Sequence, residues 1–331
     1  MSGPLFYLVV LLVYLGTDLL AAWGLNLEFG VSGVANLAFI VVIAAGAYTY
    51  GVLTLGPDTG ANAFQTYVGG VHLPFGVAVL AAAAAGAVVG VLIGITGLKR
   101  LRQDYQAMVM LVVALMAATV VGAANGFLNG DAGLSLIPNP FADLGTASGD
   151  WVYVAMVAFA CLIGYFVMRR FTGGPMGRAL RAMRDDEHAT AAMGYSVVRL
   201  RLLSQAVGGA FGGVSGALLV AFIGGWSPGA WAYVETLALL TAIIVGGMGN
   251  DFGVTMGTFL IAVLLLQGVQ FLPQISSHTG LTEAIGWMVL GGVTIIFLWL
   301  RPQGIVRERR PRYRWTGEPN QAAPAGPAPP A

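Results

Sequence analysis

Charged side chains gather in one internal segment of this 331-residue sequence, Gly173–Arg201, which we call the charged segment. Its first half carries charges of both signs: Arg178, Arg181, Arg184, Asp185, Asp186 and Glu187. Residues three or four apart lie on one side of a helix, so the arginines predict a basic band along a short helix, and Arg181 can pair with Asp185. Such a helix could bind a charged surface of another protein, or it could be a solvated loop.

The end of this predicted helix is also marked in the sequence. Gly194 stands where glycine commonly ends a helix, and we expect a second helix to begin near Val197. Hydrophobic runs long enough to cross a bilayer lie on both sides of the charged segment. The expected shape is a helix, a glycine turn and the foot of a membrane helix.

The other reactive residue types form no enzymatic pattern. The single lysine, Lys99, is followed by Arg100, which excludes the phosphate-binding loop of ATPases. The single cysteine, Cys161, lies in an apolar run and cannot form an internal disulfide. The three histidines lack the spacing of metal ligands, being His72, His188 and His278. We expect a chain that is not an enzyme and that binds no metal and no cofactor.

Two carboxylates lie inside apolar runs, where a charge is costly and should face protein or a water-filled cavity. Glu235 is near the outer end of its run, and Asp18 is two-thirds along the first run. Glu235 could line a substrate path, or it could lie at the outer surface, since Trp231 and Tyr233 resemble an interfacial aromatic belt. The same two alternatives apply to Asp18.

The composition indicates the class of protein. Hydrophobic residues make up 57% of the chain and charged residues 9%, and the mean hydropathy is +0.79. In soluble proteins about a quarter of residues are charged. The predicted fold is therefore all-α, a polytopic bundle of transmembrane helices, in contact with membrane lipid and without a nucleic-acid partner.

Apolar runs near the ~20 residues of a spanning helix predict about nine crossings, within a range of roughly 8 to 10. The runs are Leu5–Leu25, Asn36–Leu55, Pro74–Leu98, Ala107–Phe127, Trp151–Met168, Leu202–Phe222, Trp231–Met248, Phe252–Phe271 and Ala284–Leu300. The run Trp231–Met248 breaks at Gly246-Gly247, so we expect a shorter or discontinuous span. No basic residue precedes the first run, so a retained helix is expected instead of a signal peptide.

The basic residues predict the orientation of the chain. All sixteen fall within Lys99–Arg102, Arg169–Arg201 and Arg301–Arg314, which the positive-inside rule places in the cytoplasm. The loop Leu128–Asp150 is then outside, as is the N-terminus, and the C-terminus is inside. We divide the chain into a membrane domain, residues 1–305, and a basic, Pro/Ala-rich tail, residues 306–331, which is expected to be disordered.

A helix break is predicted where Gly30 and Gly33 lie between two asparagines. Transporters use broken helices to bring backbone groups near a substrate. With Glu235, the candidates for a translocation path are therefore Asn26, Phe29, Gly30 and Asn36. A plain loop is the alternative.

Glycines repeat every four residues in the run Leu202–Phe222, at Gly208, Gly212 and Gly216. Such a face lacks side chains and allows another helix to approach closely. The partner helix could belong to this subunit or to another one.

Four motifs occur in order between Asn26 and Ile305. They are N-L-x-F-G-x-x-G-x-x-N from Asn26 with Gly46-Ala47-Tyr48-Thr49; G-R-A-L-R-A-M-R-D-D-E from Gly177 to Glu187 with Ala192-Met193-Gly194-Tyr195; Gly246-Gly247-Met248-Gly249 with Gly253 and Gly257; and Pro302-Gln303-Gly304-Ile305. Together they resemble the LivM-like permeases of branched-chain amino-acid ABC transporters. Gln205 departs from the family, which usually has an aromatic residue there, and this affects the packing at the helix foot.

The resemblance implies an importer subunit in the cell inner membrane that translocates branched-chain amino acids. Its implied partners are a homologous LivH-like permease, two ABC ATPases that bind the ATP, and an extracytoplasmic substrate-binding protein. The charged segment would contain the coupling helix that docks on an ATPase, and this helix would run from Gly177 to Gly194. The alternatives are a permease for urea, short amides or another small solute, or a secondary transporter, although no basic residue lies within a predicted span.

Overall fold

The computed structural model describes residues 3–57, 62–96, 103–142, 145–230, 233–267, 281–301 and 303–308. In these residues the regular structure is helical, apart from one pair of two-residue strands and an isolated bridge between Tyr67 and Leu128, which confirms the predicted all-α class. The strands, β1 (Leu134–Ser135) and β2 (Gly225–Trp226), pair antiparallel.

Helical segments coincide with all nine predicted apolar runs. They are α1 (Gly3–Asn26), α2 (Phe39–Thr54), α3 (Phe75–Thr96), α4 (Gln103–Ala123), α6 (Thr146–Thr172), α9 (Val197–Ile223), α10 (Tyr233–Gly246), α11 (Asp251–Thr258) with the π-helical η6 (Phe259–Gln267), and α12 (Leu281–Leu300). Five of these, α1, α3, α4, α6 and α9, are long and apolar enough to cross a membrane, and the others are shorter apolar helices. The chain is thus a polytopic helical bundle.

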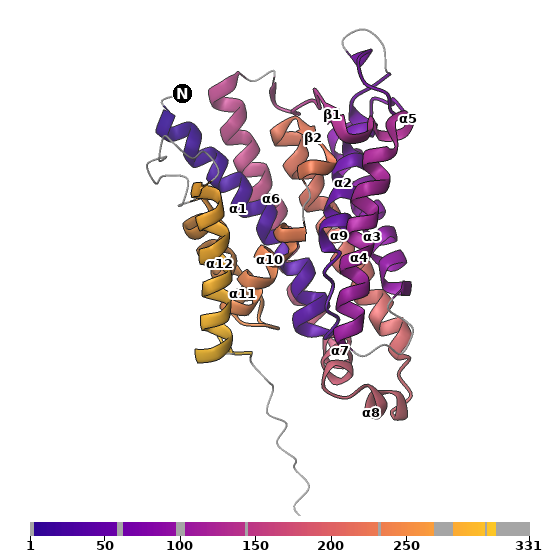
Figure 1. The fold of residues 1–331 in the computed structure, drawn as a ribbon, viewed down its shortest axis with the longest axis vertical. Helices are drawn as coiled ribbons and strands as arrows, with labels where there is room; N and C mark the ends of the chain where they lie inside the picture. Colours follow the sequence, from indigo (N-terminus) through magenta and orange to yellow (C-terminus); the bar gives the residue numbers. More distant parts are fainter. Residues whose placement is uncertain are drawn as a thin grey trace, which may run out of the picture.

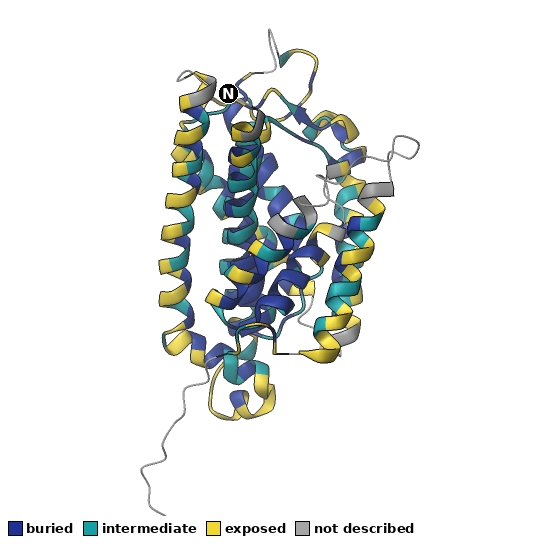
Figure 2. Ribbon diagram, turned by 90° about the vertical axis from the view of Figure 1, so that its left-hand side faces the viewer, coloured by how far each residue is buried: buried dark blue, intermediate teal, exposed yellow. Residues whose placement is uncertain are grey.

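Helix α9 lies at the centre of the bundle and packs against α1, α2 and α3. In its apolar window 61% of residues are buried, against 22% for α4 and α6, so those two helices turn most of their side chains outward. Figure 2 shows the same layering, with buried residues inside and exposed residues along the outer helices.

The glycines of α9 explain this close packing. Gly208 and Gly216 lie against backbone carbonyls of α1 and α2, and Gly212 lies against Phe39 and Val42. Gly209 and Gly213 form a second face, which meets the backbone of α3 at Gly86. A side chain at Gly208, Gly209, Gly213 or Gly216 would overlap neighbouring backbone, and one at Gly212 would crowd side chains of α2. The partner helices of both glycine faces therefore belong to this chain.

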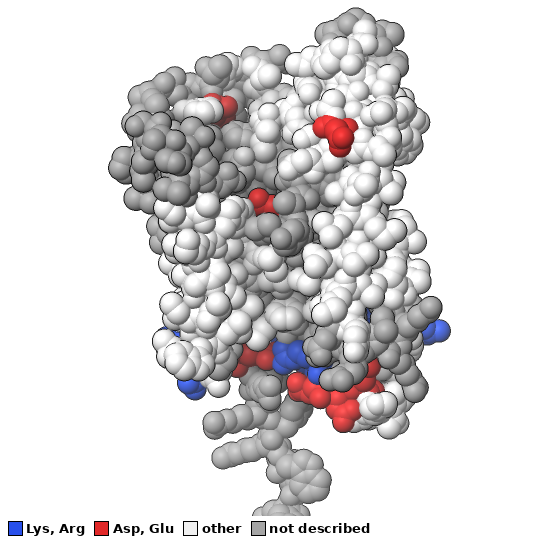
Figure 3. Space-filling view, viewed as in Figure 1, with Lys and Arg blue, Asp and Glu red and all other residues white. Residues whose placement is uncertain are grey.

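The bundle has two different ends (Figure 1). The start of α1, the β1–β2 pair and the short helices α5 (Asn125–Leu128), η3 (Gly130–Ala132) and η5 (Pro228–Ala230) lie towards one end. The short helices α7 (Pro175–Asp185) and α8 (Glu187–Ala192) lie at the other. On the face shown in Figure 3, the Arg atoms of the described residues lie at the end with α7 and α8.

Two breaks interrupt the helices at the α7 end. Helix α1 ends at Asn26 and passes through a π-helical turn, η1 (Leu27–Val31), to an irregular stretch in which Gly33 has φ +75°. Between α10 and α11 the chain turns at Gly247 and Gly249, both with positive φ, and the Asn250 side chain caps α11. The predicted break at Gly246-Gly247 is present, although η6 ends at Gln267 and the rest of the run Phe252–Phe271 lies outside the described residues.

Ordered contacts continue past the predicted boundary at Ile305. The Val306 amide donates to the Gly246 carbonyl at 3.0 Å, and the Ile305 amide donates to the Val245 carbonyl at 2.8 Å. The side chain of Glu308 is 14% exposed and forms ion pairs with α7. Residues 306–308 therefore pack on the helical domain; residues 309–331 lie outside the described residues.

Candidate functional site

The charged segment forms two helices, α7 and α8, where one was predicted. The break is at Asp186, whose backbone is extended (φ −156°, ψ 110°) and whose carboxylate accepts the amides of His188 and Ala189 at 2.8 and 3.0 Å. Asp186 is thus the N-cap of α8. The two N–H donors, that of Ala189 first, hold the pKa of Asp186 below its usual value. Gly194, with φ +88°, follows α8, and α9 begins at Val197, as predicted.

Helix α7 has a buried face and an exposed face. Gly177, Ala179, Leu180 and Met183 are buried, and Pro175 at the first helical position starts the helix after Gly174. Arg178 is exposed, as are the acidic residues Asp185, Asp186 and Glu187. The side chains of Arg181 and Arg184 are only 23% and 19% exposed. The three arginines therefore do not form one outward basic band. Residues three apart on a helix are not exactly aligned, so the side chains of Arg181 and Arg184 lie progressively nearer to the protein than that of Arg178.

Arg181 pairs with Glu308 and not with Asp185. Its Nε donates to Glu308 Oε1 at 2.9 Å, and its Nη1 donates to the Thr172 carbonyl at 2.9 Å. The predicted pair within α7 is thus wrong, because Glu308 offers Arg181 a partner that is shielded from water, whereas Asp185 is exposed. The sequence analysis missed this ion pair. The sequence did offer a signal for it, because Glu308 is the one acidic residue from Arg301 to Arg314.

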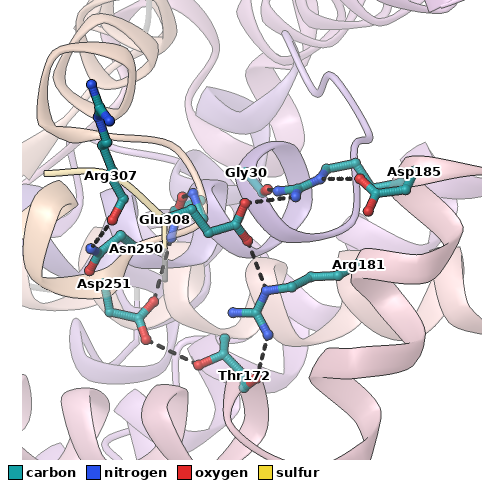
Figure 4. A network of polar contacts seen from close by, with 11 residues as sticks. Gly30, Thr172, Arg181, Asp185, Asn250, Asp251, Arg307 and Glu308 are labelled. Carbon is teal, nitrogen blue, oxygen red and sulfur yellow. Dashed lines mark hydrogen bonds and ion pairs between the residues drawn. The ribbon is translucent and has the colours of Figure 1, made fainter. Parts of the chain in front are cut away.

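Arg184 connects α7 to the broken end of α1. Its guanidinium donates to Glu308 Oε2 at 2.8 Å and to the Gly30 carbonyl, and its Nε lies 3.6 Å from Asp185 Oδ1 (Figure 4). The last carbonyls of a helix lack partners within the helix, so an arginine there satisfies one of them and complements the helix dipole. Glu308 therefore holds two arginines that extend to different parts of the chain.

A second carboxylate, Asp251, completes the cluster at the start of α11. It accepts from Thr172 Oγ1 at 3.0 Å and from Asn26 Nδ2 at 3.5 Å. Asn26 Oδ1 in turn accepts the Gly249 amide at 3.0 Å, so Asn26 joins α1 to the turn between α10 and α11. A side chain on Gly30 would overlap Asn26 Oδ1, which explains the glycine at that place. We call this group the polar cluster: Asn26, Gly30, Thr172, Arg181, Arg184, Asp251 and Glu308.

A buried carboxyl group that the sequence analysis missed lies beside the polar cluster. Glu28 is fully buried, and its Oε2 accepts from Asn36 Nδ2 at 2.8 Å, while Oε1 lies against Gly208. Asn36 also donates to Gln205 Oε1 at 3.3 Å. The departure from the family pattern at Gln205 thus places a buried amide next to the broken helix. The sequence did offer a signal for this buried carboxyl group, because Glu28 is a charged residue just after the end of an apolar run.

The candidates for a translocation path do not lie in one place. Asn26, Gly30 and Asn36 meet at the α7 end, and Phe29 is half-buried against the core. Glu235 is exposed near the start of α10, away from them. A separate apolar cavity of about 490 Å³ lies between α2, α3 and α4, and Tyr48 and Thr49 contribute its polar groups. That volume accommodates a small apolar group.

Among the described residues, no three His, Cys, Asp or Glu side chains are close enough together to hold a metal ion. The thiol of Cys161 donates to the Gly16 carbonyl at 3.2 Å and serves helix packing between α6 and α1.

Residues 7–298 match the family model described as "Branched-chain amino acid transport system / permease component". The high-affinity branched-chain amino acid transport system permease protein LivM of Salmonella typhimurium is 28% identical over 314 residues, which cover 88% of this chain and 68% of that protein. The probable branched-chain amino acid transport permease protein LivM of Methanocaldococcus jannaschii is 25% identical over 325 residues, covering 91% and 93%. The xylose transport system permease protein XylH of Haemophilus influenzae is 26% identical over 152 residues, covering 44% and 38%. No solved structure matches the chain.

Proposed function

Because this chain belongs to the family of permease components of branched-chain amino acid transport systems, we propose that it forms a membrane path together with a homologous second permease. The chain is a permease of a branched-chain amino acid ABC importer. Two ABC ATPases and an extracytoplasmic binding protein complete the proposed importer, in the inner membrane. The chain's own sequence lacks the phosphate-binding loop, so ATP is bound by the partner subunits.

In this proposal the end of the bundle with α7 and α8 faces the cytoplasm. Its support is the one-sided charge distribution, because basic residues favour the cytoplasmic side of a membrane. The start of α1 and the β1–β2 pair, at the opposite end of the bundle, then face the extracytoplasmic binding protein.

The exposed residues of α7 and α8 are the proposed contact with an ATPase. The observation that supports this is the position of α7: its outer face offers Arg178 and Asp185 to a partner, and its inner face is bonded to the broken end of α1 through Arg184. A push on α7 would therefore reach the end of α1 without an intervening flexible loop. Closure of the ATPases would move α7 and rock the two permeases between outward-open and inward-open states.

Reversing the exposed charges of α7 tests this contact. In the importer reconstituted with its ATPases, Arg178→Glu combined with Asp185→Lys places like charges opposite complementary ones and should lower uptake of labelled leucine by about tenfold, equivalent to ~1.4 kcal/mol. Arg301→Glu, an exposed arginine at the end of α12, is the matched control and should transport normally. If the double variant binds the ATPases and transports at the wild-type rate, α7 is not the coupling element.

A further inference from the structure

The segment after α12, Gln303–Glu308, packs under the turn between α10 and α11, and we call it the C-terminal segment. Its backbone is paired along most of its length. The Ile305 and Val306 amides donate to Val245 and Gly246, and Asn250 Nδ2 donates to the Arg307 carbonyl at 3.0 Å. Three successive residues are thus held by the α10–α11 turn, so the segment is a fixed part of the helical domain.

Two glycines make this packing possible. Gly247 has φ +121°, and a Cβ there would overlap the Val306 carbonyl oxygen. Gly304 has φ +68° and lies against the Gly247 backbone, where a Cβ would approach the Gly247 Cα to 2.5 Å. Gly247 thus leaves room for the backbone of Val306, and Gly304 leaves room for the backbone of Gly247. The motif Gly246-Gly247-Met248-Gly249 is therefore the surface on which the C-terminal segment packs, as well as a helix break.

Glu308 connects the C-terminal segment to α7. Its two carboxylate oxygens accept separately from Arg181 and Arg184, which lie three residues apart on one side of α7 (Figure 4). All three side chains are less than a quarter exposed. Loss of one partner from such a shielded group leaves the remaining charges poorly solvated, so removing Glu308 costs more than removing one partner of an exposed ion pair.

Short links join α7 to the helices on either side of it. Gly173 and Gly174 join α6 to α7, and Asp186 is extended between α7 and α8. The orientation is set by the buried face of α7 and by the bonds of Arg181 and Arg184. Among the described residues, Glu308 is the one acidic group bonded to both arginines.

We infer that Glu308 is a positioning residue for energy coupling: it fixes α7 to the α10–α11 turn, so that movement of α7 is passed to α10 and α11 as well as to α1. This inference rests on the proposed docking of α7 on an ATPase. It adds a second route to the one through Arg184 and Gly30, and it gives the C-terminal segment a role in transport.

The test uses Glu308→Gln in the complete importer, reconstituted in liposomes with both ATPases, the second permease and the binding protein. The readout is the amount of labelled leucine taken up per ATP hydrolysed. The neutral amide keeps the shape of the side chain but removes its charge. We expect the complex to assemble and ATP hydrolysis to continue, while uptake per ATP falls by about tenfold. Glu308→Asp, which retains the charge, should recover part of the loss.

Arg307→Gln is the matched control, because the Arg307 side chain is exposed and points away from the cluster (Figure 4). It should leave uptake per ATP unchanged. Wild-type uptake per ATP in Glu308→Gln overturns the inference, and so does failure of that variant to assemble, since the role is then structural. The docking proposal is judged separately: normal transport by the Arg178 and Asp185 double variant rejects docking, whereas a defect there beside a normal Glu308→Gln importer rejects only the role of Glu308.

Discussion

At the scale of single residues, the glycines of α2, α3 and α9 determine how closely these helices pack. Gly46 on α2 lies against the backbone of Gly213, and Gly86 on α3 lies against the carbonyl of Gly209. In a membrane, lipid tails are as apolar as the side chains, so close van der Waals contact between helices replaces much of the hydrophobic driving force. These glycines therefore stabilise the bundle because they have no side chain and let the helix backbones come into contact.

Gly46→Ala should destabilise the protein. Its Cβ would overlap the backbone of Gly213, and helix backbones can yield only by separating, so we expect a loss of about 1–3 kcal/mol in the free energy of unfolding. Gly291→Ala on α12 is the matched control, since a Cβ there meets nothing within 4 Å and alanine favours helices. Thermal unfolding in detergent measures both. Equal midpoints for wild type and Gly46→Ala would contradict the packing described for α2 and α9.

At the scale of elements, the charged segment shows how one side chain divides a helix. Asp186 accepts two amides of α8, which stabilises the start of a six-residue helix that is too short to be stable alone. The break turns α8 away from α7 and leaves the acidic residues of both helices exposed. The shape of the proposed ATPase contact therefore depends on the N-cap that Asp186 provides to α8.

Asp186→Ala should loosen α8 without disturbing α7. The amides of residues 187–192 should exchange with deuterium faster in this variant, while Asp186→Asn, whose side-chain oxygen can still accept, should remain protected. The pKa of Asp186 is lowered in the folded protein, so the contribution of its charge is present above the usual carboxyl pKa and is lost as the pH falls through the folded value. Protection should thus be constant from about pH 5 upward. Unchanged exchange in Asp186→Ala would show that the cap is dispensable.

At the scale of the whole molecule, the alternating direction of the helices agrees with the proposed orientation. The start of α1 lies at the opposite end of the bundle to α7, and the turn between α10 and α11 lies next to α7 through the polar cluster. An even number of crossings thus separates the α10–α11 turn from the end of α1. In the proposed orientation, every basic residue among the described residues lies on the cytoplasmic side.

Cysteine labelling tests the orientation. In a Cys161→Ser background, a membrane-impermeant maleimide added to intact cells should label Ala132→Cys and should not label Ala189→Cys, because both positions are exposed but at opposite ends of the bundle. Thr190 is unsuitable as a labelling site because it is buried. Labelling of Ala189→Cys alone would invert the proposed topology and place α7 outside the cell.

The sequence by itself determined the membrane class, the nine apolar helical runs, the break after Asn26 and the resemblance to permeases, since these depend on composition and on spacing within short stretches. Only the tertiary structure decided which charges meet. Arg181 pairs with Glu308, 127 residues away, although Asp185 is four residues away. Asn26 meets Gly249 and Asp251, Glu28 lies against Gly208, and Gly247 makes room for Val306. Local spacing gives the pairs that are possible, but burial selects among them, because a charge shielded from water gains more from a shielded partner than from an exposed neighbour.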